Sequence, residues 1–101
     1  MLDYPIVCVG IPKTVDNDLP ITDCSPGFGS AAKYLATCIR EATFDLSSVS
    51  RTSTKVFVLE VMGRHAGWMT AACALAADHE GDAPPVLLFP EVAFDERRFL
   101  A

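Results

Sequence analysis

The sequence contains no run of lysine or arginine, and its 8 basic residues are outnumbered by 13 acidic ones, which gives a formal net charge of −5. This balance argues against a nucleic-acid-binding surface. It does not exclude phosphate binding, because a site can gather a few cations within an acidic protein. No apolar stretch approaches the roughly 20 residues that a membrane helix requires, which argues against a membrane protein.

Cysteine pairs at the spacing of zinc or redox sites are also missing. The four cysteines, each among apolar or small residues, are Cys8, Cys24, Cys38 and Cys73. Their spacing favours buried free thiols over a disulfide framework or a zinc site. The first five residues have neither a basic region nor the apolar core of a signal peptide, so we expect a cytoplasmic protein.

What the sequence does contain is an alternation of two patterns over 101 residues, enough for one small domain. Residues 5–10, 55–61 and 85–90 are short apolar runs, typical of strands buried on both faces of a parallel sheet. Helical spacing predicts helices over about 27–44 and 67–78. The fold class predicted is therefore α/β, a three-layer βαβαβ unit with a parallel sheet.

Polar residues follow each predicted strand, where parallel sheets bind ligands beyond the carboxyl ends of their strands. They lie at 13–18 after the first run, at 62–64 after the second and at Glu91 after the third. Residues 45–54 read as a Ser/Thr-rich connector, and Asp95 is suited to cap a last helix. We therefore expect one ligand site at this edge of the sheet.

The segment from Lys13 to Asp18 has two interpretations. Asp and Asn favour turns without any further purpose. Alternatively, one of the carboxylates of Asp16 and Asp18 can take a proton from an attacking hydroxyl while the other holds Mg²⁺. Lys13 beside them can neutralise a phosphoryl group in transfer.

The polar residues after the second and third apolar runs also have two interpretations each. Arg64 either pairs with a surface carboxylate or directs its guanidinium at phosphate oxygens. Gly63 lets a ligand approach the backbone closely. Glu91 is either a solvated surface residue or an acceptor of hydrogen bonds from sugar hydroxyls.

Taken together, these segments resemble the 6-phosphofructokinases. GIPKTVDND at 10–18 is similar to the catalytic loop of that family, and TD at 22–23 followed by GF at 27–28 to the segment that opens its next helix. VLEVMGRHAGW at 58–68 resembles the sugar-phosphate strand and its turn, and PE at 90–91 followed by Phe94 resembles a third contact. The order and spacing agree over nearly the whole chain.

The resemblance implies a role for each matching residue. Asp16 would be the general base for the sugar 1-hydroxyl, Asp18 would place Mg²⁺, and Lys13 and Arg64 would stabilise the transferring phosphoryl group. The implied contacts with fructose 6-phosphate are Thr14, Val15, Asp16, Met62, Gly63, Arg64 and Glu91. Lys13 and the HAGW run at 65–68 resemble the members that use pyrophosphate, with ATP as the alternative donor.

The resemblance also implies what is missing. Residues 1–101 would be the central segment of a single partial phosphofructokinase domain, without the donor-binding part before it and the C-terminal part after it. The implied enzyme is a homo-oligomer, although Lys55 stands where many members place an arginine that reaches the neighbouring subunit. A non-catalytic remnant that binds sugar phosphate or pairs with full-length subunits is the alternative from a different class.

Overall fold

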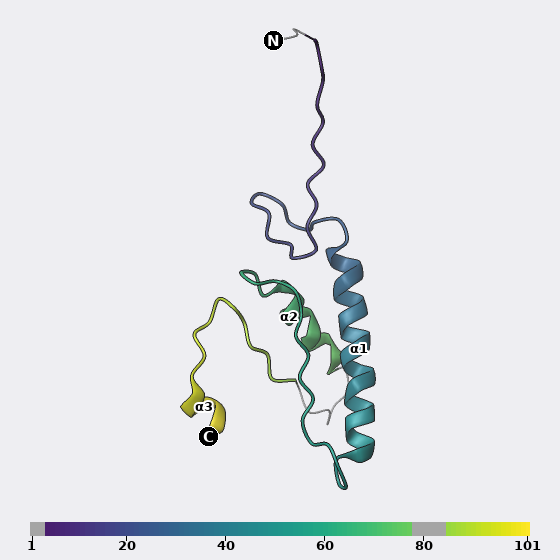
Figure 1. Cartoon of the computed structure of the whole chain (residues 1–101), viewed down its shortest axis with the longest axis vertical. Helices are drawn as coiled ribbons and strands as arrows, with labels where there is room; N and C mark the ends of the chain where they lie inside the picture. The colour runs from purple at the N-terminus through teal and green to yellow at the C-terminus, as the bar shows by residue number, and fades with distance from the viewer. Residues whose placement is uncertain (1–3, 78–84) are drawn as a thin grey trace.

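The computed structural model describes residues 4–77 and 85–101. The regular elements within them are the helices α1 (Phe28–Val49), α2 (Trp68–Ala72) and α3 (Glu96–Leu100) and the 3-10 helix η1 (Cys73–Ala76). The molecule is elongated, with extents of 71 × 29 × 24 Å. Figure 1 shows the N-terminal segment leading away from the end at which α1 begins.

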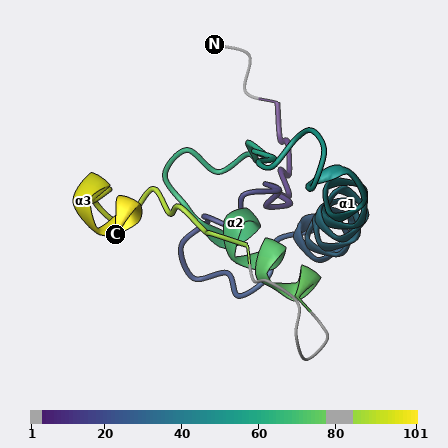
Figure 2. The same cartoon turned by 90° about the horizontal axis from the view of Figure 1, so that it is seen from below.

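The core lies where α2 and η1 pack against α1, an arrangement that both Figure 1 and Figure 2 show. Its buried residues recur at three- and four-residue spacing and are Ala66, Met69, Ala72, Cys73 and Ala76. This period places them on one face of the α2–η1 segment. Mostly small side chains on that face let the two helical layers approach closely, and burial raises the pKa of the Cys73 thiol.

Helix α1 begins where the sequence predicts it but continues to Val49 instead of ending near Phe44. The hydroxyl of Thr43 donates to the carbonyl oxygen of Ile39 at 2.8 Å, and the hydroxyl of Ser47 donates to that of Thr43 at 2.8 Å. These bonds satisfy the side chains within the helix. The Ser/Thr-rich residues after Phe44 belong to α1 and do not form a connector.

The second predicted helix is present as α2 followed by η1, so its last turn is tighter than an α-helix. Asp78, its predicted end, lies outside the described residues. The prediction that Asp95 caps the last helix is confirmed, because its Oδ1 accepts a hydrogen bond of 3.1 Å from the amide of Arg98. Helix α3 stands apart from the other helices in both views.

The predicted parallel sheet is not formed among the described residues. Residues 5–10, 55–61 and 85–90 belong to no strand in the described part of the chain. Strands are defined by ladders of hydrogen bonds to neighbours, and these three segments do not pair with one another. Their side chains remain exposed to solvent, with Val7 91% and Val58 82% exposed.

Two further sequence expectations concern thiols and membranes. All four cysteines are free, as predicted, but only Cys73 is buried, while Cys8 and Cys24 are exposed. Cys8 is exposed because it lies in one of the unpaired apolar runs.

Over residues 4–77 and 85–101, no helix has the length and hydropathy that a bilayer crossing demands.

Candidate functional site

The loop between the first apolar run and α1 closes on itself around Asn17. The side-chain nitrogen of Asn17 donates to the carbonyl oxygen of Asp23 at 3.2 Å, and its oxygen accepts from the amide of Ser25 at 2.7 Å. Asn17 is 7% exposed and has φ of 55°, in the left-handed region that asparagine tolerates better than most residues. One side chain thus joins the two ends of the loop over residues 17–25.

The two hydrogen bonds of the Asn17 side chain form a clamp across the loop. Asp16 directly precedes this clamp, and its backbone is held by the residue two positions before it. Its amide donates to the hydroxyl of Thr14 at 3.2 Å. Its carboxylate oxygen Oδ1 is buried and has no hydrogen-bond partner among the described residues. This oxygen is a buried acceptor that no protein donor satisfies in the described part of the chain, which is uncommon for a carboxylate.

An open cavity of about 490 Å³ lies next to the loop. Its lining residues are Asn17, Asp18, Leu19, Pro20, Thr22, Asp23 and Trp68. The ring of Trp68, the first residue of α2, meets the ring of Phe28, the first residue of α1, edge to face at a centroid distance of 6.3 Å. The cavity therefore has acidic loop residues on one side and the start of α2 on the other.

Ile21 introduces strain into the same loop. Its φ of 58° places a β-branched residue in the left-handed region, and its side chain is fully exposed. Such a conformation costs about 1–3 kcal/mol and persists only where the surroundings impose it. The clamp made by Asn17 is the contact that holds this loop closed.

The second turn, over residues 62–66 after the second apolar run, depends on Gly63. Its φ is 114°, and a Cβ added there would collide with the carbonyl oxygen of Ala66. The Ala66 amide in turn donates to the carbonyl oxygen of Gly63 at 3.4 Å. Only glycine fits this turn, and the neighbouring side chains of Met62 and Arg64 are exposed.

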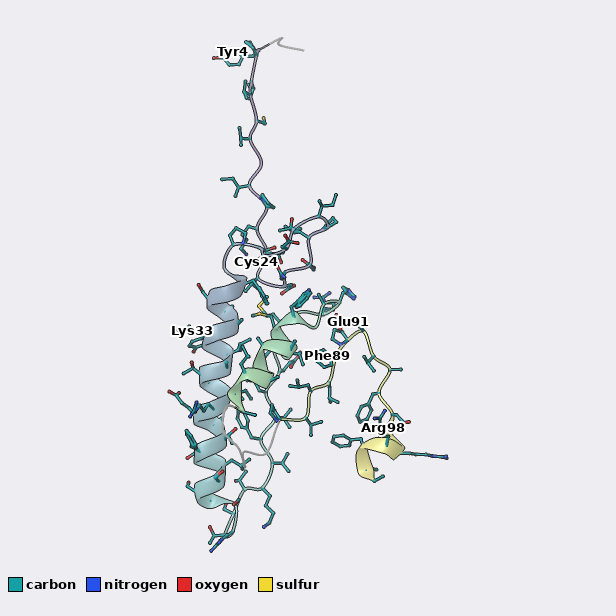
Figure 3. The ribbon with its side chains drawn as sticks, turned by 180° about the vertical axis from the view of Figure 1, so that it is seen from behind. Tyr4, Cys24, Lys33, Phe89, Glu91 and Arg98 are labelled. Carbon is teal, nitrogen blue, oxygen red and sulfur yellow. The ribbon has the colours of Figure 1, made fainter. Side chains whose placement is uncertain are left out.

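Glu91, which follows the third apolar run, is hydrogen-bonded to the residue just after the second turn. Its Oε1 accepts a hydrogen bond of 2.6 Å from the amide of Gly67, directly before α2. Figure 3 shows Glu91 and Phe89 beside α2. A Cβ on Gly67 would lie 2.6 Å from Cδ1 of Phe89 and 2.7 Å from Oε2 of Glu91, so Gly67 allows this close approach.

The start of α2 thus connects two of the predicted site segments. Asp18 lines the cavity together with Trp68, while Glu91 binds the amide of the preceding residue. Lys13 and Arg64 are exposed and do not line the cavity, and neither do Thr14, Val15, Asp16, Met62 or Gly63.

Sequence reasoning missed Asn17 and Gly67 as parts of the site. The position of Asn17 between two aspartates in a turn was an available signal, since asparagine tolerates positive φ and both donates and accepts hydrogen bonds. Gly67 lies in the HAGW run of the family resemblance, but its contacts with Phe89 and Glu91 could not be foreseen, because those residues lie far along the sequence.

A divalent cation was expected at Asp18. Among the described residues, no group of three or more histidine, cysteine, aspartate or glutamate side chains could hold a metal ion. Mg²⁺ does not require such a cage, because it commonly binds one or two carboxylates together with water and substrate phosphates. The exposed carboxylate of Asp18 at the edge of the cavity fits that mode of binding.

Comparison with known proteins decides the family. The sequence model of the family described as phosphofructokinase matches residues 2–101. This chain belongs to the phosphofructokinase family. The resemblance inferred from residues 10–18, 58–68 and 90–94 is thereby confirmed, and the backbone path is that of a phosphofructokinase α/β fold.

Three relatives define its place within the phosphofructokinases. Pyrophosphate--fructose 6-phosphate 1-phosphotransferase of Methylococcus capsulatus is 64% identical over 98% of this chain and 24% of its own length. ATP-dependent 6-phosphofructokinase of Hamiltonella defensa is 40% identical over 94% of this chain and 26% of its own. The crystal structure of pyrophosphate-dependent phosphofructokinase from Nitrosospira multiformis matches with a TM-score of 0.88 and 65% identity, over 98% of this chain and 25% of that one. The chain thus spans about a quarter of the length of these relatives.

Proposed function

We propose that this chain forms the sugar-phosphate half of an active site that transfers a phosphoryl group from pyrophosphate to the 1-hydroxyl of fructose 6-phosphate. The observation that carries the proposal is the buried, unpartnered Oδ1 of Asp16, in a loop that closes beside a cavity lined by Asp18. The product is fructose 1,6-bisphosphate, which makes the reaction a step of glycolysis. The similarity to the Methylococcus capsulatus enzyme supports this choice.

Asp16 is the general base of this reaction. Its carboxylate takes the proton of the 1-hydroxyl as the sugar oxygen forms its bond to the transferred phosphorus. The bond from that phosphorus to the bridging oxygen of pyrophosphate breaks, and inorganic phosphate leaves. A base contributes only if it accepts the proton at hydrogen-bond distance, and Oδ1 has no competing donor in the described part of the chain.

Lys13 and Arg64 balance the charge of the phosphates. Both side chains are exposed and are therefore accessible to an anionic ligand. The ammonium of Lys13 stabilises the transferring phosphoryl group as a point charge, and the fork of Arg64 holds two of its oxygens. When bound at Asp18, Mg²⁺ would neutralise charge on the phosphate oxygens.

The sugar phosphate is held by the remaining predicted residues. The loop contributes Thr14 and Val15, the second turn contributes Met62 and Gly63, and Glu91 accepts hydrogen bonds from sugar hydroxyls. Because one oxygen of Glu91 is already bound to the Gly67 amide, its orientation is fixed before the sugar arrives. Preorganised groups of this kind lower the entropic cost of reaching the reactive geometry.

We propose a cytoplasmic homo-oligomer as the state of the complete enzyme. The Nζ of Lys55, at the position where many members of the family place an arginine that reaches the neighbouring subunit, donates to the carbonyl oxygen of Ser50 at 3.0 Å. Lys55 is exposed, so its ammonium remains accessible to a phosphate from another subunit.

ATP is the second candidate donor, because the Hamiltonella defensa relative is named for it. The two donors are separated by steady-state kinetics of the complete gene product that contains these residues, with fructose 6-phosphate, Mg²⁺ and either pyrophosphate or ATP. We expect the higher kcat/KM with pyrophosphate and no turnover by an Asp16→Ala control. Higher kcat/KM with ATP reverses the donor, and turnover unaffected by Asp16→Ala refutes the proposed site.

A further inference from the structure

Asn17 stands between the proposed base and the proposed metal ligand, and both ends of its amide are engaged. It binds the Asp23 carbonyl and the Ser25 amide, six and eight residues further along the chain. These bonds cross the base of the loop instead of satisfying Asn17 within its own turn. The side chain is thus bound to backbone on the opposite side of the loop.

We propose that Asn17 is a positioning residue whose amide clamps the loop over residues 17–25 and thereby sets the places of Asp16 and Asp18. This inference rests on the proposed function, because it concerns the same two carboxylates. Asn17 itself does not touch the reacting atoms, and it acts through the backbone that carries its two neighbours.

Asparagine combines the three properties that this position uses. Its nitrogen donates, its oxygen accepts, and its backbone tolerates φ of 55°. Aspartate keeps the acceptor but loses the donor and adds a third negative charge beside Asp16 and Asp18. Glycine keeps the backbone freedom but loses both bonds, and alanine loses the bonds and disfavours the left-handed conformation.

The clamp matters for chemistry because the two carboxylates have few other restraints. Asp16 is held through its amide by Thr14, while Asp18 is exposed at the edge of the cavity. Opening the loop moves Asp18 relative to Asp16. A displacement of about 1 Å of a catalytic group can cost about 10²-fold in rate.

The experiment compares Asn17→Gly and Asn17→Ala in the complete gene product, with Cys24→Ser as the control. Cys24 lies in the same loop, its side chain is exposed, and it makes no bond to Asn17. Three measurements are made on each protein: kcat and KM for fructose 6-phosphate, the melting temperature, and hydrogen–deuterium exchange of the peptide that contains the Ser25 amide.

We expect both Asn17 variants to exchange the Ser25 amide faster than the unaltered protein and to lose about 10-fold to 10²-fold in kcat, with a much smaller change in KM. The control keeps the original values. A merely structural residue lowers the melting temperature but leaves kcat per folded molecule unchanged.

Each other outcome has a definite meaning. If Asn17→Gly keeps the original kcat while Asn17→Ala loses it, only the backbone conformation matters and the clamp is refuted. If exchange at Ser25 is the same in all proteins, the clamp is also refuted. If exchange responds as expected but the unaltered protein transfers no phosphoryl group from either donor, the proposed function fails and the clamp remains as a loop restraint.

Discussion

The amide of Gly67 donates a hydrogen bond of 2.6 Å to Oε1 of Glu91, 24 residues further along the chain. It joins the turn before α2 to the segment after the third apolar run, so the carboxylate of Glu91 is held by the backbone of that turn. The missing side chain of Gly67 is what allows it, since Phe89 and the second oxygen of Glu91 occupy that space.

Replacing Gly67 with alanine should therefore displace the glutamate. Its Cβ would lie 2.6 Å from Cδ1 of Phe89 and 2.7 Å from Oε2 of Glu91, so both side chains must shift. We expect a higher KM for fructose 6-phosphate in the complete gene product and a stability loss of about 1–3 kcal/mol, which is typical of overpacking. Gly29→Ala in α1, where a Cβ meets nothing within 4 Å, is the matched control and should be harmless. An unchanged KM in Gly67→Ala would remove Glu91 from sugar binding.

Asp16→Asn and Asp18→Asn should fail in different ways. An amide at position 16 keeps the shape but takes no proton, so kcat should fall by at least about 10²- to 10⁴-fold, with much less change in KM. An amide at position 18 weakens the hold on Mg²⁺, and raising the Mg²⁺ concentration should partly restore its activity. Titrating both variants with Mg²⁺ tests the assignment. Equal rescue of both, or a near-normal kcat for Asp16→Asn, would show that the roles are misassigned.

Ile21→Gly should relieve backbone strain in the loop. Glycine adopts φ of 58° without the clash that a β-branched residue meets, although it also loosens the unfolded chain. The strain at such a position is worth about 1–3 kcal/mol, so we expect a higher melting temperature in thermal unfolding of the complete gene product. Ile21 does not line the cavity, and kcat should therefore stay close to its original value. A lower melting temperature would mean that the strain is compensated by contacts elsewhere.

Residues 1–101 by themselves should show no turnover and only marginal folding. The apolar runs are open, as the 91% exposure of Val7 shows, and exposed apolar surface of this extent calls for further protein to cover it. The chain also covers only 24% of the length of its Methylococcus capsulatus relative. Assay of the isolated chain beside its Asp16→Ala variant, together with a thermal melt, tests both statements. Turnover above that variant, or a sharp cooperative transition, would contradict them.

Much of the helical structure could be predicted from local patterns. Three- and four-residue spacing located α1 and the α2–η1 segment, and the capping preference of aspartate located the start of α3. The end of α1 could not be predicted from composition, because serine and threonine are modest helix formers, yet the helix continues through them to Val49. The sheet was predicted from hydrophobic runs alone, yet strands need neighbours, and the runs do not supply them to one another.

The residue types of the candidate site can be read from the sequence, but the contacts that hold these residues in place cannot. Carboxylates and cations after apolar runs are visible in the sequence, and the family resemblance assigns them roles. The restraints that place them are long-range, such as the bond between Asn17 and Ser25 and the contact of Gly67 with Glu91. No local pattern encodes which backbone group will lie opposite a given side chain.

The edge-to-face contact between Phe28 and Trp68 has an optical consequence. Trp68 is the only tryptophan in the sequence, it is 53% exposed, and it lines the cavity that also contains Asp18. Its indole emission depends on the polarity and mobility of that surface. The molecule thus carries a built-in fluorophore at the edge of the proposed ligand site, and binding of an anion or a sugar there is testable without a label.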